Sequence, residues 1–315
     1  AVLIIPILRK LKFGQTILEI GPAWHKSKQG TPTMGGLIFI LAITASVIIT
    51  YCVAVAKNPQ NPVVRKDSIN LFSGLIMALL FGMVGFIDDY IKVVKKQNLG
   101  LTASQKILFQ VIITAVYLVS RYYLGNTSTV VNIPFFGQFD MGFLYYIVMG
   151  ILIIGIVNSA NLTDGVDGLL GSVTFVIAIF FIITTGILKL ELSNIMACAL
   201  AGALIGFLIF NLHPAKVFMG DTGSFFLGGL VVALAFSIDM PILLFFVGFI
   251  YCCESLSVIL QVISFKTTGK RIFKMSPIHH HFEMCGYSEN KIVALFCFVT
   301  AIMCVIAYFA VLRLV

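Results

Sequence analysis

The sequence predicts an all-α polytopic membrane protein with about ten transmembrane helices, the first of them truncated. Of the 315 residues, 59% are hydrophobic and only 11% are charged, and the mean hydropathy is +1.05. A soluble domain does not carry that much apolar surface. The apolar residues also form long runs, most of which can cross a hydrocarbon core of about 30 Å as a helix. A soluble enzyme or a nucleic-acid-binding module is therefore not expected.

Nine apolar runs follow one another along the chain. They cover residues 35–56, 69–87, 104–124, 141–157, 170–188, 194–211, 225–238, 240–263 and 292–312. The seventh run is short, and we expect its helix to begin earlier, near Asp221. Before the runs, the stub AVLIIPIL is followed at once by basic residues, which indicates the end of a first span and not a signal peptide.

The distribution of Lys and Arg predicts the orientation in the membrane. Nine crossings after residue 34 place five segments on one side, namely 9–34, 88–103, 158–169, 212–224 and 264–291. Fifteen Lys and Arg lie at or near the ends of these segments and six near the opposite ends, so the first side is expected to be cytoplasmic. This basic face suits membrane lipid headgroups, and it equally suits a phosphorylated substrate.

We expect the whole chain, residues 1–315, to form a single integral membrane domain. No internal repeat, low-complexity tract or long linker divides it. The seven Cys are scattered without CxxC spacing, which argues against a disulfide framework or a zinc site. On the extracytoplasmic side only residues 130–139 have strand-like character, and they predict a small hairpin around Pro134-Phe135-Phe136-Gly137.

A polar island, residues 158–169 with the sequence NSANLTDGVDGL, separates two apolar runs. Asn158, Asn161 and Asp164 recur every third residue, so they share one face if the preceding helix continues into the island. Asp164 and Asp167 are costly at the edge of a span, which favours a binding site. The alternative is a polar loop in which Asp167 caps the following helix.

Two further cytoplasmic segments carry residues suited to phosphate and metal. In SKQGTPTMGG, Lys28 offers a cation and Thr33 a hydroxyl, although such a segment is more often an ordinary helix entry. In GFIDDYIK, Asp88 and Asp89 repel each other unless a cation lies between them, which predicts a divalent metal or a raised pKa. In the alternative, both face water and Lys92 pairs with Asp88 at i+4.

The segment NLHPAKVFMGDTGS, residues 211–224, predicts the start of a helix capped by Asp or Thr. The free N–H groups of such a helix suit phosphate oxygens, and Asp221 also suits a hard cation.

In PIHHHFE, three consecutive His diverge on a helix or a strand and cannot all bind one ion. Their imidazoles are better suited to hydrogen bonds with sugar hydroxyls or phosphates than to binding zinc. Glu254, in the preceding span, is expected to be paired or protonated.

These five motifs, in this order, closely resemble the phospho-N-acetylmuramoyl-pentapeptide transferase family of the polyprenyl-phosphate N-acetylhexosamine-1-phosphate transferase superfamily. The resemblance covers essentially the whole chain, and TPTMGG and PIHHHFE point to this branch. It implies transfer of phospho-MurNAc-pentapeptide from UDP-MurNAc-pentapeptide to undecaprenyl phosphate, giving lipid I and UMP, with Mg²⁺ as cofactor. It also implies a multi-pass protein of the bacterial inner membrane with a cytoplasmic active site, and it leaves a homodimer open.

The resemblance also assigns roles to residues of this chain. Asp88 and Asp89 match the catalytic Asp pair, and Asp221 matches a catalytic, magnesium-binding Asp beside which Asp89 is expected to bind the metal. Phe218 matches an aromatic that stacks on uracil. The remaining positions expected to contact substrate are Lys28, Thr33, Lys106, Asn158, Asn161, Asp164, Asp167, Asn211, Gln261, His279, His280 and His281. Without the resemblance, the sequence predicts that Lys106 faces lipid phosphate or solvent.

Two other functions compete with this one. A sister enzyme would transfer GlcNAc-1-phosphate to the same kind of lipid, and PIHHHFE argues against it. A secondary transporter would also carry acidic residues within its spans, but it would place them near the midplane and show inverted repeats. The Asp residues here lie at the cytoplasmic ends of spans.

Overall fold

The computed structural model describes residues 5–6, 30–57, 62–95 and 99–313, and it confirms an all-α membrane architecture. Within that part of the chain, nine helices are long and apolar enough to cross a membrane. They are α2 (Gly36–Lys57), α3 (Pro62–Val94), α4 (Ala103–Tyr123), α5 (Leu144–Thr163), α6 (Leu169–Ile187), α7 (Glu191–Asn211), α8 (Gly220–Ser237), α10 (Phe249–Thr268) and α12 (Glu289–Leu312). The predicted stub of a first span lies almost wholly outside the described residues.

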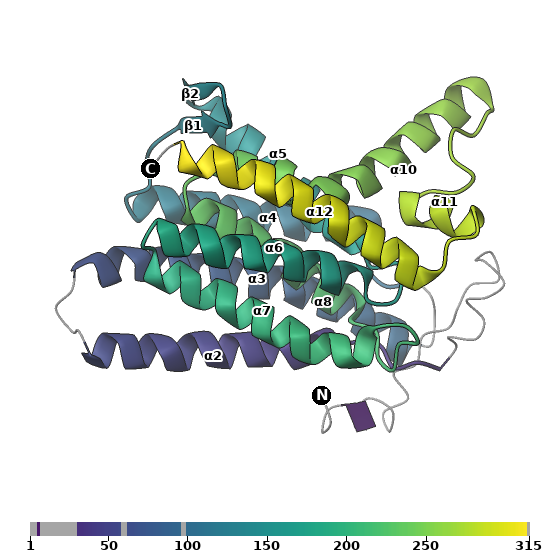
Figure 1. Cartoon of the computed structure of the whole chain (residues 1–315), viewed down its shortest axis with the longest axis horizontal. Helices are drawn as coiled ribbons and strands as arrows, with labels where there is room; N and C mark the ends of the chain where they lie inside the picture. The colour runs from purple at the N-terminus through teal and green to yellow at the C-terminus, as the bar shows by residue number, and fades with distance from the viewer. Residues whose placement is uncertain (1–4, 7–29, 58–61, 96–98, 314–315) are drawn as a thin grey trace.

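Helix α8 forms the centre of the bundle. Every residue from Thr222 to Ser237 is buried, and α3, α5, α2 and α6 pack around it (Figure 1). Small residues permit this close packing: a Cβ on Gly228 would lie 2.9 Å from the Val157 Cα, and one on Gly229 would lie 3.0 Å from the Ala78 Cα. As expected, α8 begins earlier than its apolar run, at Gly220.

The eighth apolar run is not one continuous helix, contrary to the sequence prediction. It is divided into a 3₁₀ turn, η2 (Pro241–Leu243), a short α9 (Leu244–Val247) and α10, with Gly248 between the last two. The hydrophobicity of the run does not reveal such a break, because the residues on both sides of it are apolar. Helix α10 then leaves the bundle at an angle and is followed by α11 (Ile278–Met284), as Figure 1 shows.

The predicted hairpin is confirmed. Strands β1 (Val130–Ile133) and β2 (Gly137–Asp140) pair antiparallel, with Val131 opposite Phe139. Close to it, the Arg121 guanidinium lies 2.9 Å from an Asp239 carboxylate oxygen, which joins α4 to the turn after α8. This ion pair lies at the end of the bundle opposite the Asp-rich motifs.

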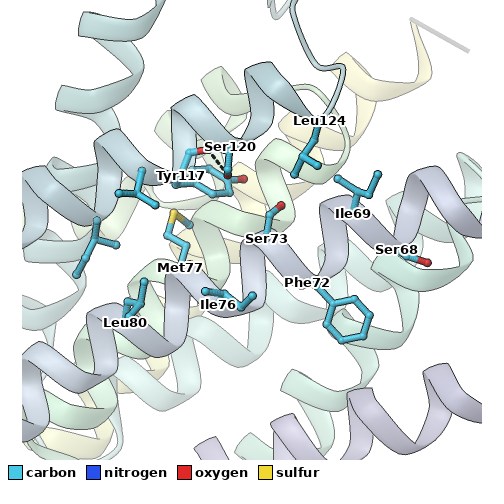
Figure 2. Close-up of a pocket in the computed structure, with 12 residues that line it drawn as sticks. Ser68, Ile69, Phe72, Ser73, Ile76, Met77, Leu80, Tyr117, Ser120 and Leu124 are labelled. Carbon is cyan, nitrogen blue, oxygen red and sulfur yellow. Dashed lines mark hydrogen bonds between the residues drawn. The ribbon is translucent and has the colours of Figure 1, made fainter.

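A cavity of about 400 Å³ lies between α3 and α4 (Figure 2). Its lining is mainly apolar and includes Ile76, Met77 and Tyr117. Two of its hydroxyls, those of Ser73 and Ser120, donate to carbonyls of their own helices, at 3.3 and 2.7 Å. The cavity occupies the halves of these helices that lie away from the Asp residues, so it is separate from the predicted site.

Candidate active site

Three carboxylates from two helices meet at one end of the bundle. Asp88 and Asp89 lie near the end of α3, and Asp221 lies in the first turn of α8. One oxygen from each lies within 4.8 Å of the others, and Asp88 and Asp89 are buried. The helices can approach because Gly85 has no side chain: a Cβ there would lie 2.1 Å from the Asp221 carbonyl oxygen. The structure thus brings together the motifs GFIDDYIK and FMGD.

Two ammonium groups join Asp88 to Asp221. Lys92 Nζ lies 2.6 Å from Asp88 Oδ2 and 3.3 Å from Asp221 Oδ2. Lys106 Nζ lies 3.1 Å from Asp88 Oδ1 and 2.8 Å from Asp221 Oδ2. The i+4 pair of Lys92 and Asp88 is therefore present, as the alternative interpretation expected, but inside the cluster. Lys106 points into this cluster and not toward lipid phosphate or solvent, so the prediction made for it without the resemblance was wrong.

Asp89 binds the start of α8. Its Oδ1 accepts a hydrogen bond from the backbone N–H of Asp221 at 3.2 Å. Its Oδ2 accepts from the Thr222 N–H at 2.9 Å and from the Thr222 hydroxyl at 2.7 Å. The expectation that an Asp or Thr of the segment 211–224 caps this helix was wrong, because no side chain of the local N-cap residue does so. The carboxylate comes from α3 instead, a contact that local sequence patterns do not encode.

The two Asn of the polar island have different partners. The Asn161 side chain donates to Asp221 Oδ1 at 3.0 Å and to the Ser224 hydroxyl at 2.8 Å, so it belongs to the carboxylate cluster. Asn158 pairs with Gln110 on α4, with amide contacts of 2.7 and 3.2 Å. Its amide thus joins α5 to α4.

The motif TPTMGG pairs with the segment before α8. The Phe218 N–H donates to the Pro32 carbonyl, and the Gly35 N–H donates to the Phe218 carbonyl, both at 2.8 Å. Phe218 is therefore fixed by its backbone while its side chain stays half-buried. Thr33 is buried beside Gly220, where an added Cβ would lie 2.9 Å from the Thr33 hydroxyl. Lys28 lies outside the described residues.

Asn211 supplies a polar atom without a partner. Its side-chain N–H donates to the Val217 carbonyl at 2.9 Å, which closes the turn before Phe218. Its Oδ1 is buried and has no hydrogen-bond partner among the described residues. An acceptor of this kind suits an N–H group of a ligand.

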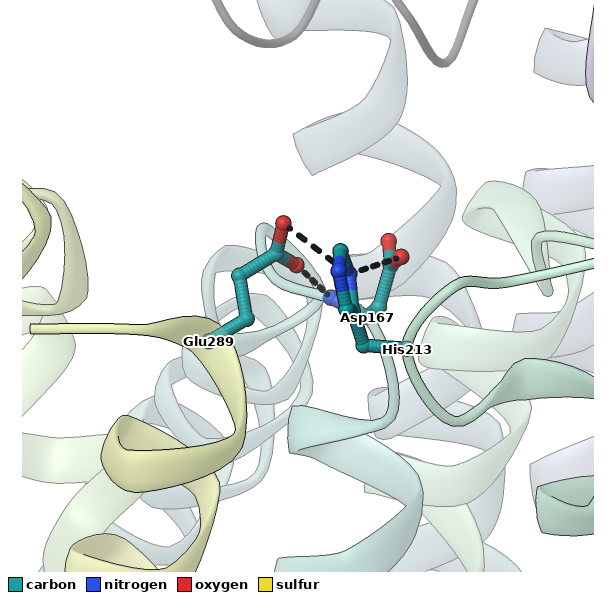
Figure 3. Close-up of side chains that lie close together, drawn as sticks. All are labelled: Asp167, His213 and Glu289. Atoms are coloured by element: carbon teal, nitrogen blue, oxygen red, sulfur yellow. Dashed lines mark hydrogen bonds and ion pairs between the residues drawn. The ribbon is translucent and has the colours of Figure 1, made fainter.

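Asp167 joins three separate segments (Figure 3). Its Oδ2 lies 3.1 Å from His213 Nδ1 and accepts from the Ala215 N–H at 3.0 Å. Its backbone N–H donates to Glu289, at the start of α12, at 2.9 Å. These contacts tie the island to the segment 211–224, and they overturn the idea that Asp167 caps α6. The N-cap residue is Gly168, and no side chain caps the helix there.

Asp164 lies in the turn between α5 and α6 and is half-buried. Burial raises the pKa of its carboxyl well above the usual value, and the negative charges of Asp221, Asp89 and Asp167 raise this pKa further. A cation placed among these carboxylates would favour ionisation of Asp164. The turn is therefore electrostatically coupled to the cluster.

The three His of α11 diverge, as predicted. His279 Nδ1 lies 3.0 Å from the Glu254 carboxylate, which confirms that Glu254 is paired. His280 Nδ1 lies 2.5 Å from Glu283. His281 Nδ1 accepts from the Lys274 N–H at 3.2 Å. Because each ring has a different partner, the triplet is not arranged around one ion.

The side chain of Gln261 is bound inside the protein through both its oxygen and its nitrogen. Its amide N–H donates to the Phe273 carbonyl at 2.9 Å, and its Oε1 accepts from the N–H groups of Ile272 and Phe273 at 3.0 and 2.9 Å. It holds the segment after α10. None of these three bonds uses the second amide N–H, which leaves a donor for the substrate contact that the resemblance implies.

The sequence interpretation gave no role in the site to two residues that the structure places there. The sequence predicts Lys92 only as a surface partner of Asp88, although a cation one helical turn after two Asp is itself a signal of a charged site. The sequence motifs assigned no role to Glu289, and its position as the acidic residue in the first turn of a helix was the available signal. Both approach residues that lie more than 120 positions away in the chain.

Comparisons with known proteins give a consistent result. The profile of glycosyl transferase family 4 matches residues 71–239, and the phospho-N-acetylmuramoyl-pentapeptide-transferase signature 1 matches residues 28–40. A phospho-N-acetylmuramoyl-pentapeptide-transferase of Bacillus subtilis is 48% identical over 297 residues, covering 93% of this chain and 88% of the relative. One from Clostridium perfringens strain SM101 is 49% identical over 311 residues, covering 97% and 90%.

Proposed function

The chain belongs to the phospho-N-acetylmuramoyl-pentapeptide-transferase family, and from this we propose that it transfers phospho-MurNAc-pentapeptide from UDP-MurNAc-pentapeptide to undecaprenyl phosphate. The products are lipid I, an intermediate of peptidoglycan synthesis, and UMP. The observation that supports this most directly is the cluster of Asp88, Asp221, Lys92 and Lys106 at the ends of three membrane-spanning helices, α3, α4 and α8. At that position a lipid-borne phosphate can meet a water-soluble nucleotide.

The two lysines suit the charge of the reactants. An oxygen of undecaprenyl phosphate attacks the phosphorus that carries the sugar, and the bond from that phosphorus to the bridging oxygen breaks. UMP leaves with the bonding electron pair. The developing negative charge needs cations that are already in place, which Lys92 and Lys106 supply. Asp88 holds both ammonium groups and is the residue that we propose to position or deprotonate the acceptor phosphate.

The residues fit a bound magnesium ion. Three carboxylates whose oxygens lie within 4.8 Å of one another form a set of hard oxygen donors. When bound, Mg²⁺ would neutralise charge on the diphosphate. We propose Asp221 as its main ligand, with Asp89 beside it, as the resemblance implies. Because both Asp89 oxygens also accept hydrogen bonds from α8, we propose that Asp89 holds that helix as well.

The nucleotide would lie beside the cluster, between the island and the segment 211–224. Phe218 offers a half-buried ring whose backbone is fixed, and Asn211 offers a buried acceptor. We propose that these two residues contact the uracil ring. The basic ends of the segments on this side support a cytoplasmic active site in the bacterial inner membrane.

The test is Mg²⁺-dependent release of UMP by the purified protein with undecaprenyl phosphate. UDP-MurNAc-pentapeptide and UDP-GlcNAc are offered in parallel. Release with the first donor only is the expected result. Release with UDP-GlcNAc only would assign the protein to the sister branch, and no release from folded protein would contradict the proposal. A phospho-sugar trapped on an Asp side chain would replace the single displacement by a two-step covalent route.

A further inference from the structure

Glu254 is a fully buried acidic residue inside a membrane-spanning helix. It lies in α10, and its exposed fraction is 0%. A carboxylate in that position costs free energy unless it has a partner. The partner is His279 of α11: Glu254 Oε1 lies 3.0 Å from His279 Nδ1, and Glu254 Oε2 accepts from the His279 backbone N–H at 3.4 Å. The same carboxylate therefore binds both the ring and the backbone of one residue.

The other side of the His279 ring packs against the protein as well. Its exposed fraction is 1%, and it faces Gly165 in the turn between α5 and α6. A Cβ on Gly165 would lie 2.2 Å from His279 Nε2. The ring thus occupies the space that a side chain on Gly165 would need. It joins α11 and α10, the second of which leans away from the bundle in Figure 1, to the island that contains Asp164.

This arrangement selects one form of the ring. A carboxylate can only accept hydrogen bonds, so His279 Nδ1 must carry the proton that Glu254 binds. Nε2 is then the remaining polar atom of the ring. It is buried and has no hydrogen-bond partner among the described residues. If the ring turned over, Nε2 would face Glu254 and Nδ1 would be displaced from it.

We propose that Glu254 is a positioning residue for the transfer reaction and acts through His279, whose ring it holds in one orientation and one protonation form against Gly165. The inference rests on the proposed function and on the resemblance, which implies that His279 contacts substrate. Glu254 itself lies behind this ring within α10 and contacts no substrate. Its effect on turnover is therefore carried by the imidazole.

A double-mutant cycle on the full chain in detergent tests this. Glu254→Ala is expected to lower kcat for UMP release roughly 10- to 100-fold, because it leaves a buried N–H without its acceptor. His279→Ala is expected to lower kcat at least as much. Since Glu254 acts through His279, the double variant should be no slower than His279→Ala alone. If the fold-losses of kcat in the two single variants multiplied in the double variant, the proposal would be overturned.

Two further variants separate positioning from general damage to the fold. Glu254→Gln keeps an oxygen that can accept from Nδ1–H and should recover most of the kcat lost in Glu254→Ala. Glu191→Ala removes an exposed Glu at the start of α7 and should leave kcat unchanged. If Glu254→Gln is as slow as Glu254→Ala while both retain the thermal stability of the parent protein, the hydrogen bond is not what Glu254 contributes.

A measurement without substrate keeps this inference distinct from the proposed function. The chain has five His, so ¹⁵N-His labelling gives few signals, and that of His279 is assigned from its loss in His279→Ala. In the parent protein, His279 should show protonated Nδ1 and unprotonated Nε2, and Glu254→Ala should change this pattern. A Nε2-protonated ring in the parent would contradict the inference. If the parent released no UMP with any donor, the proposed function would fail while this spectrum still decided how Glu254 holds the ring.

Discussion

Asp89 on α3 accepts two hydrogen bonds from Thr222 on α8, one from its backbone N–H at 2.9 Å and one from its hydroxyl at 2.7 Å. A helix start normally receives such bonds from a residue just before it. Here the bonds come from another membrane span, so Asp89 sets where α8 begins relative to α3. The consequence is that Asp221 lies beside Asp88.

Asp89→Ala is therefore expected to destabilise the protein as well as to inactivate it. Loss of the carboxylate leaves N–H groups at the start of α8 without acceptors, at a cost of about 1–3 kcal/mol. The apparent melting temperature should fall even in the presence of a chelator. If Asp89 served only as a metal ligand, the melting temperature in chelator would not change. Asp140→Asn, on the hairpin at the opposite end, is a control that should leave activity unaffected.

Gly85→Ala should inactivate the enzyme although Gly85 contacts no substrate. The new Cβ would lie 2.1 Å from the Asp221 carbonyl oxygen, which must push α3 and α8 apart. Displacement of catalytic groups by about 1 Å can cost roughly 100-fold in rate. UMP release by the two proteins measures the loss.

Gly155→Ala is the matched control for that change. Gly155 also lies within a membrane-spanning helix, but a Cβ there would have no heavy atom within 4 Å. Because Ala favours helix by about 1 kcal/mol over Gly, both variants gain equally from propensity. Full activity of Gly85→Ala would mean that the close contact of α3 with α8 does not set the site.

Asp221→Asn should abolish Mg²⁺-dependent turnover. The substitution removes the charge that both Lys92 and Lys106 contact and the oxygen proposed to bind the metal. Titration with Mn²⁺, followed by electron paramagnetic resonance, should show the loss of one bound ion. Unchanged dependence of UMP release on Mg²⁺ would remove Asp221 from the metal site.

The raised pKa of Asp164 predicts a dependence of stability on pH. In the unfolded chain Asp164 ionises near its usual pKa of 3.8, whereas burial and the neighbouring carboxylates raise the pKa in the folded protein. The contribution of neutral Asp164 to the free energy of unfolding is therefore fully present below pH 3.8, and it is lost as pH rises through the pKa of the folded protein. Asp164→Asn stays neutral, so in chelator its melting temperature should increasingly exceed that of the parent as pH rises. A difference that is constant between pH 4 and pH 8 would contradict this.

Phe218→Ala should weaken nucleotide binding without altering the fold around it. The backbone of Phe218 is fixed by Pro32 and Gly35, so its ring can be removed while the segment stays in place. Loss of stacking should cost about 0.5–1.5 kcal/mol beyond the lost contact area. Calorimetric titration with UMP measures the change, and equal affinity would count against a stacking role.

Much of the fold follows from the sequence alone. Spans α2, α4, α6, α7 and α12 lie within about three residues of their predicted bounds, because apolar runs of sufficient length have no stable alternative in a bilayer. Helix α3 extends about seven residues beyond its apolar run at each end, and α5 ends about six residues later than predicted, because polar residues continue these helices. The early start of α8, the hairpin and the divergence of the three His were also predictable, since each depends on residues that are near in the chain. The gathering of Asp88, Asp89 and Asp221 at one end followed from counting crossings.

What the sequence could not determine were the partners across the bundle. Lys106 joining Asp88 to Asp221, Asp89 holding the start of α8, and Glu254 binding His279 all connect different helices. The break at Gly248 belongs to the same group, because it depends on how η2 and α9 pack and not on apolar content. In a membrane the lipid-facing and the helix-facing sides of a span are both largely apolar, so hydrophobicity does not specify which faces meet. Only the close approach of small residues such as Gly85, together with the pairing of buried polar groups, decides it.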